Sequence, residues 1–282
     1  MTKTNFQEML EAGVHFGHLK RKWNPAMAPY IFMERNGIHI IDLNKTLVKL
    51  DEAAQAIKQI ARSGKKVLFV ATKKQAKDIV AESAKSVNMP YITERWSGGM
   101  LTNFPTVRKA IKKMTSIDKM KVDGTFENIS KRERLQIERQ RIKLDTVLGS
   151  IKEMNKLPAA LFVVDVSKEK IAVAEAKRLH IPVFGIVDTN SDPNIEFPIP
   201  ANDDASKSIK VIIDVITSAI AEGLDERKAN REMEAKSKEK NVSAKSEGAK
   251  KARRTRAKKV ETSENKQTET AKNEAKEEKK AE

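Results

Sequence analysis

The stretch AALFVVDVSKEKIAVAEAKRLHIPVFGIVDTN, residues 159–190, decides the fold. It contains two apolar runs rich in β-branched residues, 159–166 and 181–190, with a helical pattern over 169–180 between them. A strand, a helix and a second strand in this order form a β-α-β unit with parallel strands. Strands that are apolar throughout are typical of a parallel sheet covered by helices on both faces, so we predict an α/β fold.

The same alternation of strands and helices extends in both directions from this unit. Three further strands are predicted before it, at 37–42, 65–72 and 90–94. Helices are predicted between them, at 43–64 and 73–87, and Gly64 ends the first of these. After the unit, residues 203–224 are predicted to form a closing helix with Asp203 or Asp204 near its cap.

The alternation stops between about Thr106 and Met154, where two highly charged helices are predicted. The first carries one apolar stripe, formed by Val107, Ile111, Met114 and Ile117. The second opens with the capping box of Ser130 and Glu133, and its apolar side holds Leu135, Ile142 and Ile151. We expect an antiparallel helical hairpin that contacts partners. A solvated hairpin without a partner is the alternative.

The carboxyl-terminal part of the chain differs in composition from the rest. From Glu226 onward there are 19 Lys and Arg residues against 12 Asp and Glu, a net charge of +7, and no aromatic residue. Such a segment buries too little apolar surface to offset its ordering entropy. We therefore predict an α/β domain over 1–105 and 155–225, a hairpin insertion over 106–154, and a disordered charged tail over 226–282. The tail is either a solvated segment or an arm that contacts RNA.

The overall composition indicates a polyanionic partner. The 282 residues carry a formal charge of +16, which favours nucleic acid or an anionic membrane surface. No apolar run approaches the roughly 20 residues that span a bilayer, and the start lacks a stretch of signal-peptide type. The absence of cysteine excludes disulfides, thiolate zinc sites and cysteine nucleophiles. We expect a soluble, cytoplasmic protein without a membrane partner.

Sequence motifs for catalysis or nucleotide binding are missing. No GxGxxG or GxxxxGK[ST] occurs, and no serine or threonine stands in a recognisable nucleophile setting. His15 and His18 could bind a metal together with acids that follow a strand or begin a helix, namely Asp188, Asp192, Asp203 and Asp204. We expect no catalytic residue, no cofactor and no small-molecule substrate. An α/β enzyme with a metal or nucleotide site near His18 and Asp188 remains the alternative.

Two basic segments are better candidates for a functional site. HLKRKWNP, residues 18–25, and ERWSGGMLTNFPTVRK, residues 94–109, each place cations beside a tryptophan. Cations neutralise phosphates and an exposed indole stacks on a base, whereas a buried indole would only anchor the core. We extend the expected RNA-binding set to cations of the hairpin. It comprises Lys20, Arg21, Lys22, Trp23, Arg95, Trp96, Asn103, Arg108, Lys109, Lys112, Lys113 and Arg132.

Six blocks of the sequence, read in order, resemble the bacterial small-subunit ribosomal protein S-two family. They are LEAGVHFGH with WNPAMAPYIF, NGIHIIDLNKT, RWSGGMLTNF, LPAALFVVDV, IPVFGIVDTNSDPN and PIPANDDA. The hairpin matches more loosely, and Ala159 stands where the family usually carries an acid.

The resemblance covers about residues 1–225. It implies a Rossmann-like or flavodoxin-like domain with a coiled-coil hairpin, bound to small-subunit ribosomal RNA near the head–body junction. It also implies a structural role in translation and help in docking ribosomal protein S-one.

Overall fold

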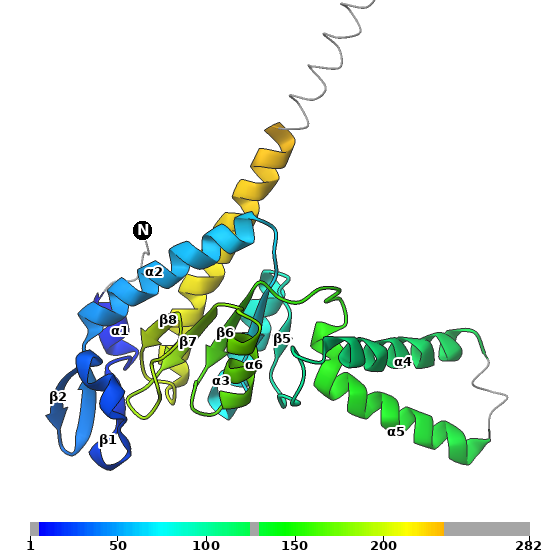
Figure 1. Ribbon diagram of the computed structural model, residues 1–282, viewed down its shortest axis with the longest axis horizontal. Helices are drawn as coiled ribbons and strands as arrows, with labels where there is room; N and C mark the ends of the chain where they lie inside the picture. Colours follow the sequence, from blue (N-terminus) through cyan, green and yellow to red (C-terminus); the bar gives the residue numbers. More distant parts are fainter. Residues whose placement is uncertain (1–5, 125–129, 234–282) are drawn as a thin grey trace, which may run out of the picture. The chain divides into compact units, whose positions relative to one another are not determined.

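A computed structural model of the chain describes residues 6–124 and 130–233 (Figure 1). The chain divides into two compact units, Met1–Arg227 and Lys228–Glu282, and the fold described below is that of the first. Most of the predicted tail, residues 234–282, lies outside the described residues, and 226–233 are helical. No helix within the described ranges is both long and apolar enough to cross a membrane.

The main sheet has five parallel strands in the order β5-β4-β6-β7-β8. They are β4 (Val67–Val70), β5 (Tyr91–Ile92), β6 (Ala160–Val164), β7 (Val183–Val187) and β8 (Phe197–Pro200). The predicted β-α-β unit is confirmed as β6, α6 (Lys170–Arg178) and β7, with Leu161 opposite Val183. β8 was not predicted from the sequence, and its prolines at 198 and 200 suit its place at the sheet edge.

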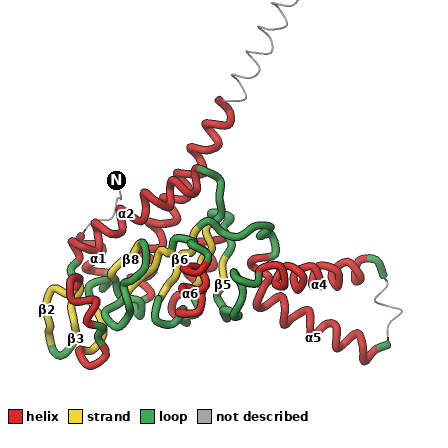
Figure 2. Tube along the Cα trace, in the orientation of Figure 1, coloured by secondary structure: helices red, strands yellow, loops and turns green. Residues whose placement is uncertain are grey.

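Helices cover both faces of the main sheet, as predicted. Alternate strand residues point to opposite faces, so Phe69, Phe162 and Phe184 pack on one side with α2 (Leu43–Arg62), α3 (Lys74–Ser86) and the helix that begins at residue 206. Leu68, Leu161 and Val163 pack on the other side with α6 and the segment around Trp96. Figure 2 shows the yellow strands between these red helices. The core therefore lies in two layers, one on each face.

A second, antiparallel sheet lies at the amino end of the chain, with the order β1-β3-β2. Its strands are β1 (Phe16–Leu19), β2 (Ile31–Arg35) and β3 (Ile38–Ile41), and α1 (Phe6–Glu11) precedes them. The predicted strand at 37–42 is thus real but belongs to this sheet. Asn36 and Gly37 both have positive φ, 53° and 73°, as a tight hairpin turn requires. The Asn-Gly pair is the sequence signal for this hairpin, which was not predicted.

Two helices, α4 (Phe104–Val122) and α5 (Lys131–Leu148), separate β5 from β6 and contact each other. Ser130 caps α5 as predicted, since its side chain accepts from the Glu133 N–H at 3.4 Å. The stripe of α4 is buried at Ile111, Met114 and Ile117. The predicted apolar side of α5 is only partly buried, because Leu135 and Ile142 are each 53% exposed. The connection at 125–129 lies outside the described residues.

Candidate nucleic-acid interface

The basic segment at residues 20–22 forms a short turn of 3-10 helix directly after β1, with all three side chains exposed. Its backbone is fixed at both ends. The Lys20 N–H donates to the Gly37 carbonyl at 2.9 Å, and the Asn24 N–H donates to the Thr189 carbonyl at 2.8 Å. The three cations therefore project from a rigid backbone, which lowers the entropy lost on binding a phosphate.

Thr189, which follows β7, also holds β1 against the main sheet. Its hydroxyl oxygen accepts from the His18 N–H at 2.8 Å. Gly17 allows this approach, because a Cβ there would lie 2.6 Å from the Thr189 methyl carbon and 2.9 Å from the His39 carbonyl oxygen. No other residue type fits at position 17 without moving the strand, so this glycine sets the position of the cations.

Trp23 lies at the end of the basic turn and is 38% exposed. Its ring packs on one side against the His39 ring, with the centroids 5.3 Å apart. One part of the indole is thus supported and another part faces solvent. An indole held in this way offers a surface on which a base can stack.

Trp96, in contrast, is a core residue with 7% exposure. Its indole N–H donates to Glu175 Oε1 at 3.1 Å. The same carboxylate accepts from the backbone N–H groups of Gly99, Leu101 and Thr102 at 2.7, 2.9 and 3.1 Å. Burial alone would raise the pKa of Glu175, but these donors hold the pKa below its usual range. Of the two interpretations of Trp96, the core anchor fits this position, and we leave Trp96 out of the proposed interface.

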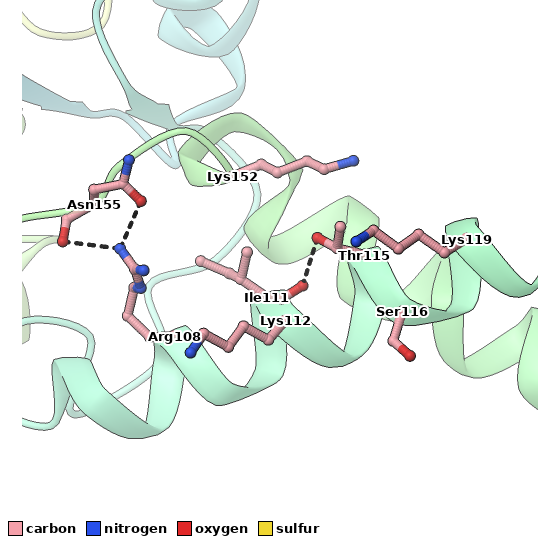
Figure 3. Close-up of a pocket in the computed structure, with 8 residues that line it drawn as sticks. All are labelled: Arg108, Ile111, Lys112, Thr115, Ser116, Lys119, Lys152 and Asn155. Atoms are coloured by element: carbon pink, nitrogen blue, oxygen red, sulfur yellow. Dashed lines mark hydrogen bonds between the residues drawn. The ribbon is translucent and has the colours of Figure 1, made fainter.

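The other predicted residues of the second basic segment are differently placed. Arg95 and Asn103 are exposed, and the Asn103 side chain accepts from the Thr106 hydroxyl at 2.8 Å at the start of α4. Arg108 is half-buried, and its guanidinium donates to the carbonyl and side-chain oxygens of Asn155 at 2.9 and 2.7 Å. Figure 3 shows Arg108 turned toward Asn155. Through these hydrogen bonds, Arg108 holds the segment that follows α5 against α4.

The remaining predicted cations are exposed on two helices: Lys109, Lys112 and Lys113 on α4, and Arg132 on α5. The helices are joined by Asp118 of α4, which pairs with Arg141 and lies 3.2 Å from Lys152 Nζ. The Arg141 guanidinium and the Lys152 ammonium lower the pKa of Asp118.

The histidine and acids singled out in the sequence do meet, at the carboxyl ends of the parallel strands. His18 Nδ1 lies 2.9 Å from Asp188 Oδ2, and His18 Nε2 lies 3.4 Å from Asp204 Oδ2. His15 and Asp192 are not part of this group. Lys73 was not predicted as a member of this group, but its Nζ lies 2.7 Å from Asp203 and 2.6 Å from Asp204. Nothing in the sequence around Lys73 indicates that it contacts acids 130 residues away, so this contact could not be predicted.

This cluster is a dense charge network. The contact with Asp188 raises the pKa of His18, and burial together with the nearby Asp188 and Asp165 raises the pKa of Asp203 to about 7. His18, Asp188 and Asp203 bring ligand atoms within 4.8 Å of one another, a donor set that suits Zn²⁺. The Lys73 ammonium already occupies one side of Asp203, so a metal ion would compete with it.

Comparison with known proteins shows the family of the chain. The profile of the family Ribosomal protein S2 matches residues 9–223. The chain is 73% identical over 237 residues to the small ribosomal subunit protein uS2 of Bacteroides fragilis, covering 83% of this chain and 85% of that one. It is 69% identical over 254 residues to the uS2 protein of Bacteroides thetaiotaomicron, covering 87% and 91%. The uS2 protein of Porphyromonas gingivalis is 69% identical over 232 residues, covering 82% and 83%. The resemblance seen in the sequence is thus confirmed, and the chain belongs to the Ribosomal protein S2 family.

Proposed function

We propose that this chain binds small-subunit ribosomal RNA through the exposed cations at residues 20–22 and helps to dock ribosomal protein S-one. As a member of its family, it is a structural protein of the small ribosomal subunit and not an enzyme. A bacterial protein of this kind works in the cytoplasm, in translation. The alternative of an α/β enzyme around His18 and Asp188 is therefore set aside.

One observation carries the RNA proposal: Lys20, Arg21 and Lys22 are exposed on a backbone that is hydrogen-bonded at both ends. Of the three, Lys20 is paired with Glu34 at 2.7 Å, and both partners are open to solvent. Such an exposed pair contributes little and is easily exchanged for a phosphate. Trp23 adds a partly exposed ring beside them. The set of expected contacts is then completed by Arg95, Asn103, Lys109, Lys112, Lys113 and Arg132.

Exposed apolar side chains support a protein partner at the same end of the chain. The antiparallel sheet leaves Phe16 50%, Phe32 69% and Met33 48% exposed. Exposed apolar side chains that gather on a soluble protein commonly mark a protein–protein contact. We assign the docking of S-one to this antiparallel sheet, with the cations at 20–22 at its border.

The strand order supports a flavodoxin-like arrangement. If the parallel strands are counted along the chain, β5-β4-β6-β7-β8 reads 2-1-3-4-5, which is the flavodoxin order. The hairpin of α4 and α5 is proposed as the coiled-coil insertion over 106–154, within an α/β domain over 1–105 and 155–225. The charged tail over 226–282 is proposed as a further RNA-contacting arm.

Binding to ribosomal RNA tests the proposal directly. The full chain is titrated into purified bacterial small-subunit ribosomal RNA at several salt concentrations. Neutralising Z phosphates makes log affinity fall against log salt with a slope of about −0.7 to −0.9 Z. A salt-independent affinity, or failure to travel with small subunits through a salt-containing gradient, would contradict the proposal.

A further inference from the structure

A second group of basic side chains lies at the amino ends of the parallel strands, away from residues 20–22. A cavity of about 920 Å³ lies where β4, β5 and β6 begin. Its lining includes five lysines, Lys65, Lys66, Lys85, Lys152 and Lys156. Glu153 is the one acid among its lining residues. None of these lysines belongs to the set expected from the sequence.

A smaller cavity of about 430 Å³ continues this one along α4. Lys152 and Asn155 line both cavities, so the two are neighbours. The smaller cavity adds Arg108, Lys112 and Lys119, and no acid is among its lining residues. In Figure 3 the Lys152 side chain extends over α4 from the segment that follows α5. Together the two cavities form what we call the lysine groove, which runs from the sheet to the hairpin.

Internal contacts leave much of this charge available. Lys66 donates to the Asn88 carbonyl, and Lys152 pairs with Asp118. Within residues 6–124 and 130–233, Lys65 and Lys156 have no acid within ion-pair distance. Lys85 lies over the Tyr91 ring, with Nζ 5.8 Å from its centroid. The groove therefore holds more cations than acids from the chain, a condition that favours an anion from a partner.

The shape and lining favour a polymer over a small molecule. Small-ligand pockets are lined mainly by apolar and aromatic side chains with a few placed polar groups. The lysine groove instead adds seven lysines and one arginine to a partly apolar lining, and it extends over two neighbouring cavities. Flexible lysines suit the evenly spaced phosphates of a nucleic-acid backbone, which needs no base-specific contact.

We infer that the lysine groove binds the phosphate backbone of a ribosomal RNA strand and holds it between the α/β domain and the hairpin. This inference rests on the proposed function, because it assigns a second contact with the same RNA. It adds residues that the sequence analysis did not consider. It also gives the position of Lys112 a reason, since this predicted cation lines the groove.

The test compares two triple variants of the full chain with equal charge loss. The groove variant is Lys65→Gln, Lys85→Gln and Lys156→Gln. The control variant is Lys74→Gln, Lys170→Gln and Lys207→Gln, three exposed lysines at the opposite, carboxyl ends of the strands. Affinity for purified bacterial small-subunit ribosomal RNA is measured against salt. We expect the groove variant to bind about tenfold or more weakly at 0.1 M salt, with a slope shallower by about two, and the control variant to bind like the parent.

Every other outcome rejects either the inference that the groove binds RNA or the proposed RNA-binding function itself. If the parent binds RNA and the groove variant binds equally well, the groove inference is wrong while the proposed function stands. Equal losses in both variants would mean a general field effect and would also overturn the groove. If the parent itself does not bind, the proposed function fails first.

Chemical acetylation of the unaltered protein gives a second readout that does not depend on a variant folding. Bound ribosomal RNA should protect Lys65, Lys85 and Lys156 from acetylation and leave Lys74, Lys170 and Lys207 reactive. Protection in intact small subunits, but not with RNA alone, would mean that an acidic protein covers the groove, which would overturn the assignment to RNA.

Discussion

Glu175 Oε1 of α6 lies 3.1 Å from Trp96 Nε1, in the segment that links β5 to α4. This hydrogen bond joins two parts of the chain 79 residues apart. The same carboxylate also accepts from the backbone N–H groups of Gly99, Leu101 and Thr102. One side chain therefore holds most of the segment between β5 and α4. A buried carboxylate on α6 thus fixes the backbone that leads into α4.

Replacing this carboxylate should destabilise the fold. Glu175→Gln removes the charge and places an amide N–H₂ among N–H donors, so we expect the free energy of unfolding to fall by about 3 kcal/mol. Glu153→Gln, at an exposed position, is the matched control and should stay within about 0.5 kcal/mol. Denaturant unfolding of the two variants checks this. If both variants are equally stable, the Glu175 carboxylate does not stabilise the fold.

The same residue predicts a dependence on pH. The folded-state pKa of Glu175 is lowered, so its contribution to stability is present above its unfolded pKa of 4.5 and is lost as pH falls through the folded value. The difference in stability between the parent and Glu175→Gln should therefore be constant near neutral pH and shrink below pH 4.5. A difference that stays constant through the acid range would contradict the charged role of Glu175.

Gly17 should be intolerant of a side chain. Gly17→Ala places a Cβ against Thr189 and the His39 carbonyl, and we expect a loss of about 1–3 kcal/mol in the free energy of unfolding. Gly98→Ala is the control, because nothing lies within 4 Å of a Cβ there. Thermal unfolding of the pair decides the matter. If Gly17→Ala is as stable as Gly98→Ala, then the close approach of β1 to Thr189 is not tight in solution.

Trp23 and Trp96 should respond differently to truncation. Trp23 is partly exposed, so Trp23→Ala should cost about 1 kcal/mol of stability and weaken RNA binding by about 1–3 kcal/mol. Trp96→Ala should instead cost about 3–5 kcal/mol of stability, because the indole is buried. Unfolding and RNA-binding measurements on both variants separate the two roles. A large loss of stability with unchanged affinity in Trp23→Ala would make Trp23 a core anchor too.

Much of the fold was predictable because the strands of a parallel sheet are apolar along their whole length. The runs at 65–72 and 159–166 carry this signal, and they became β4 and β6. β8 was not predicted, because Pro198 and Pro200 normally exclude a central strand. They are tolerated here because β8 lies at the edge of the sheet. The strand at 37–42 was found, but its partners were not, since a short exposed strand such as β2 has no apolar periodicity.

The candidate site was predictable only in part. A run of cations such as Lys20–Lys22 is visible in any sequence and is exposed for the simple reason that it cannot be buried unpaired. Whether a tryptophan is buried depends on its tertiary partners, and nothing near Trp96 in the sequence indicates Glu175. The lysine groove could not be predicted for the same reason, because its cations come from α3, from α4 and from the segments before β4 and β6, which lie far apart in the sequence.

The central claim is that the cations at 20–22 contact phosphate without supporting the fold, and one measurement tests it most directly. Salt-dependent binding to small-subunit ribosomal RNA is compared between the parent, Lys20→Ala/Arg21→Ala/Lys22→Ala, and Lys74→Ala/Lys170→Ala/Lys207→Ala as a control of equal charge. The first variant should unfold like the parent, since the substitutions are exposed, and should bind RNA more weakly with a slope shallower by up to about one unit per lost contact. The control should keep the parent's slope. If the first variant binds with the parent's affinity and slope, the phosphate contact at residues 20–22 does not exist.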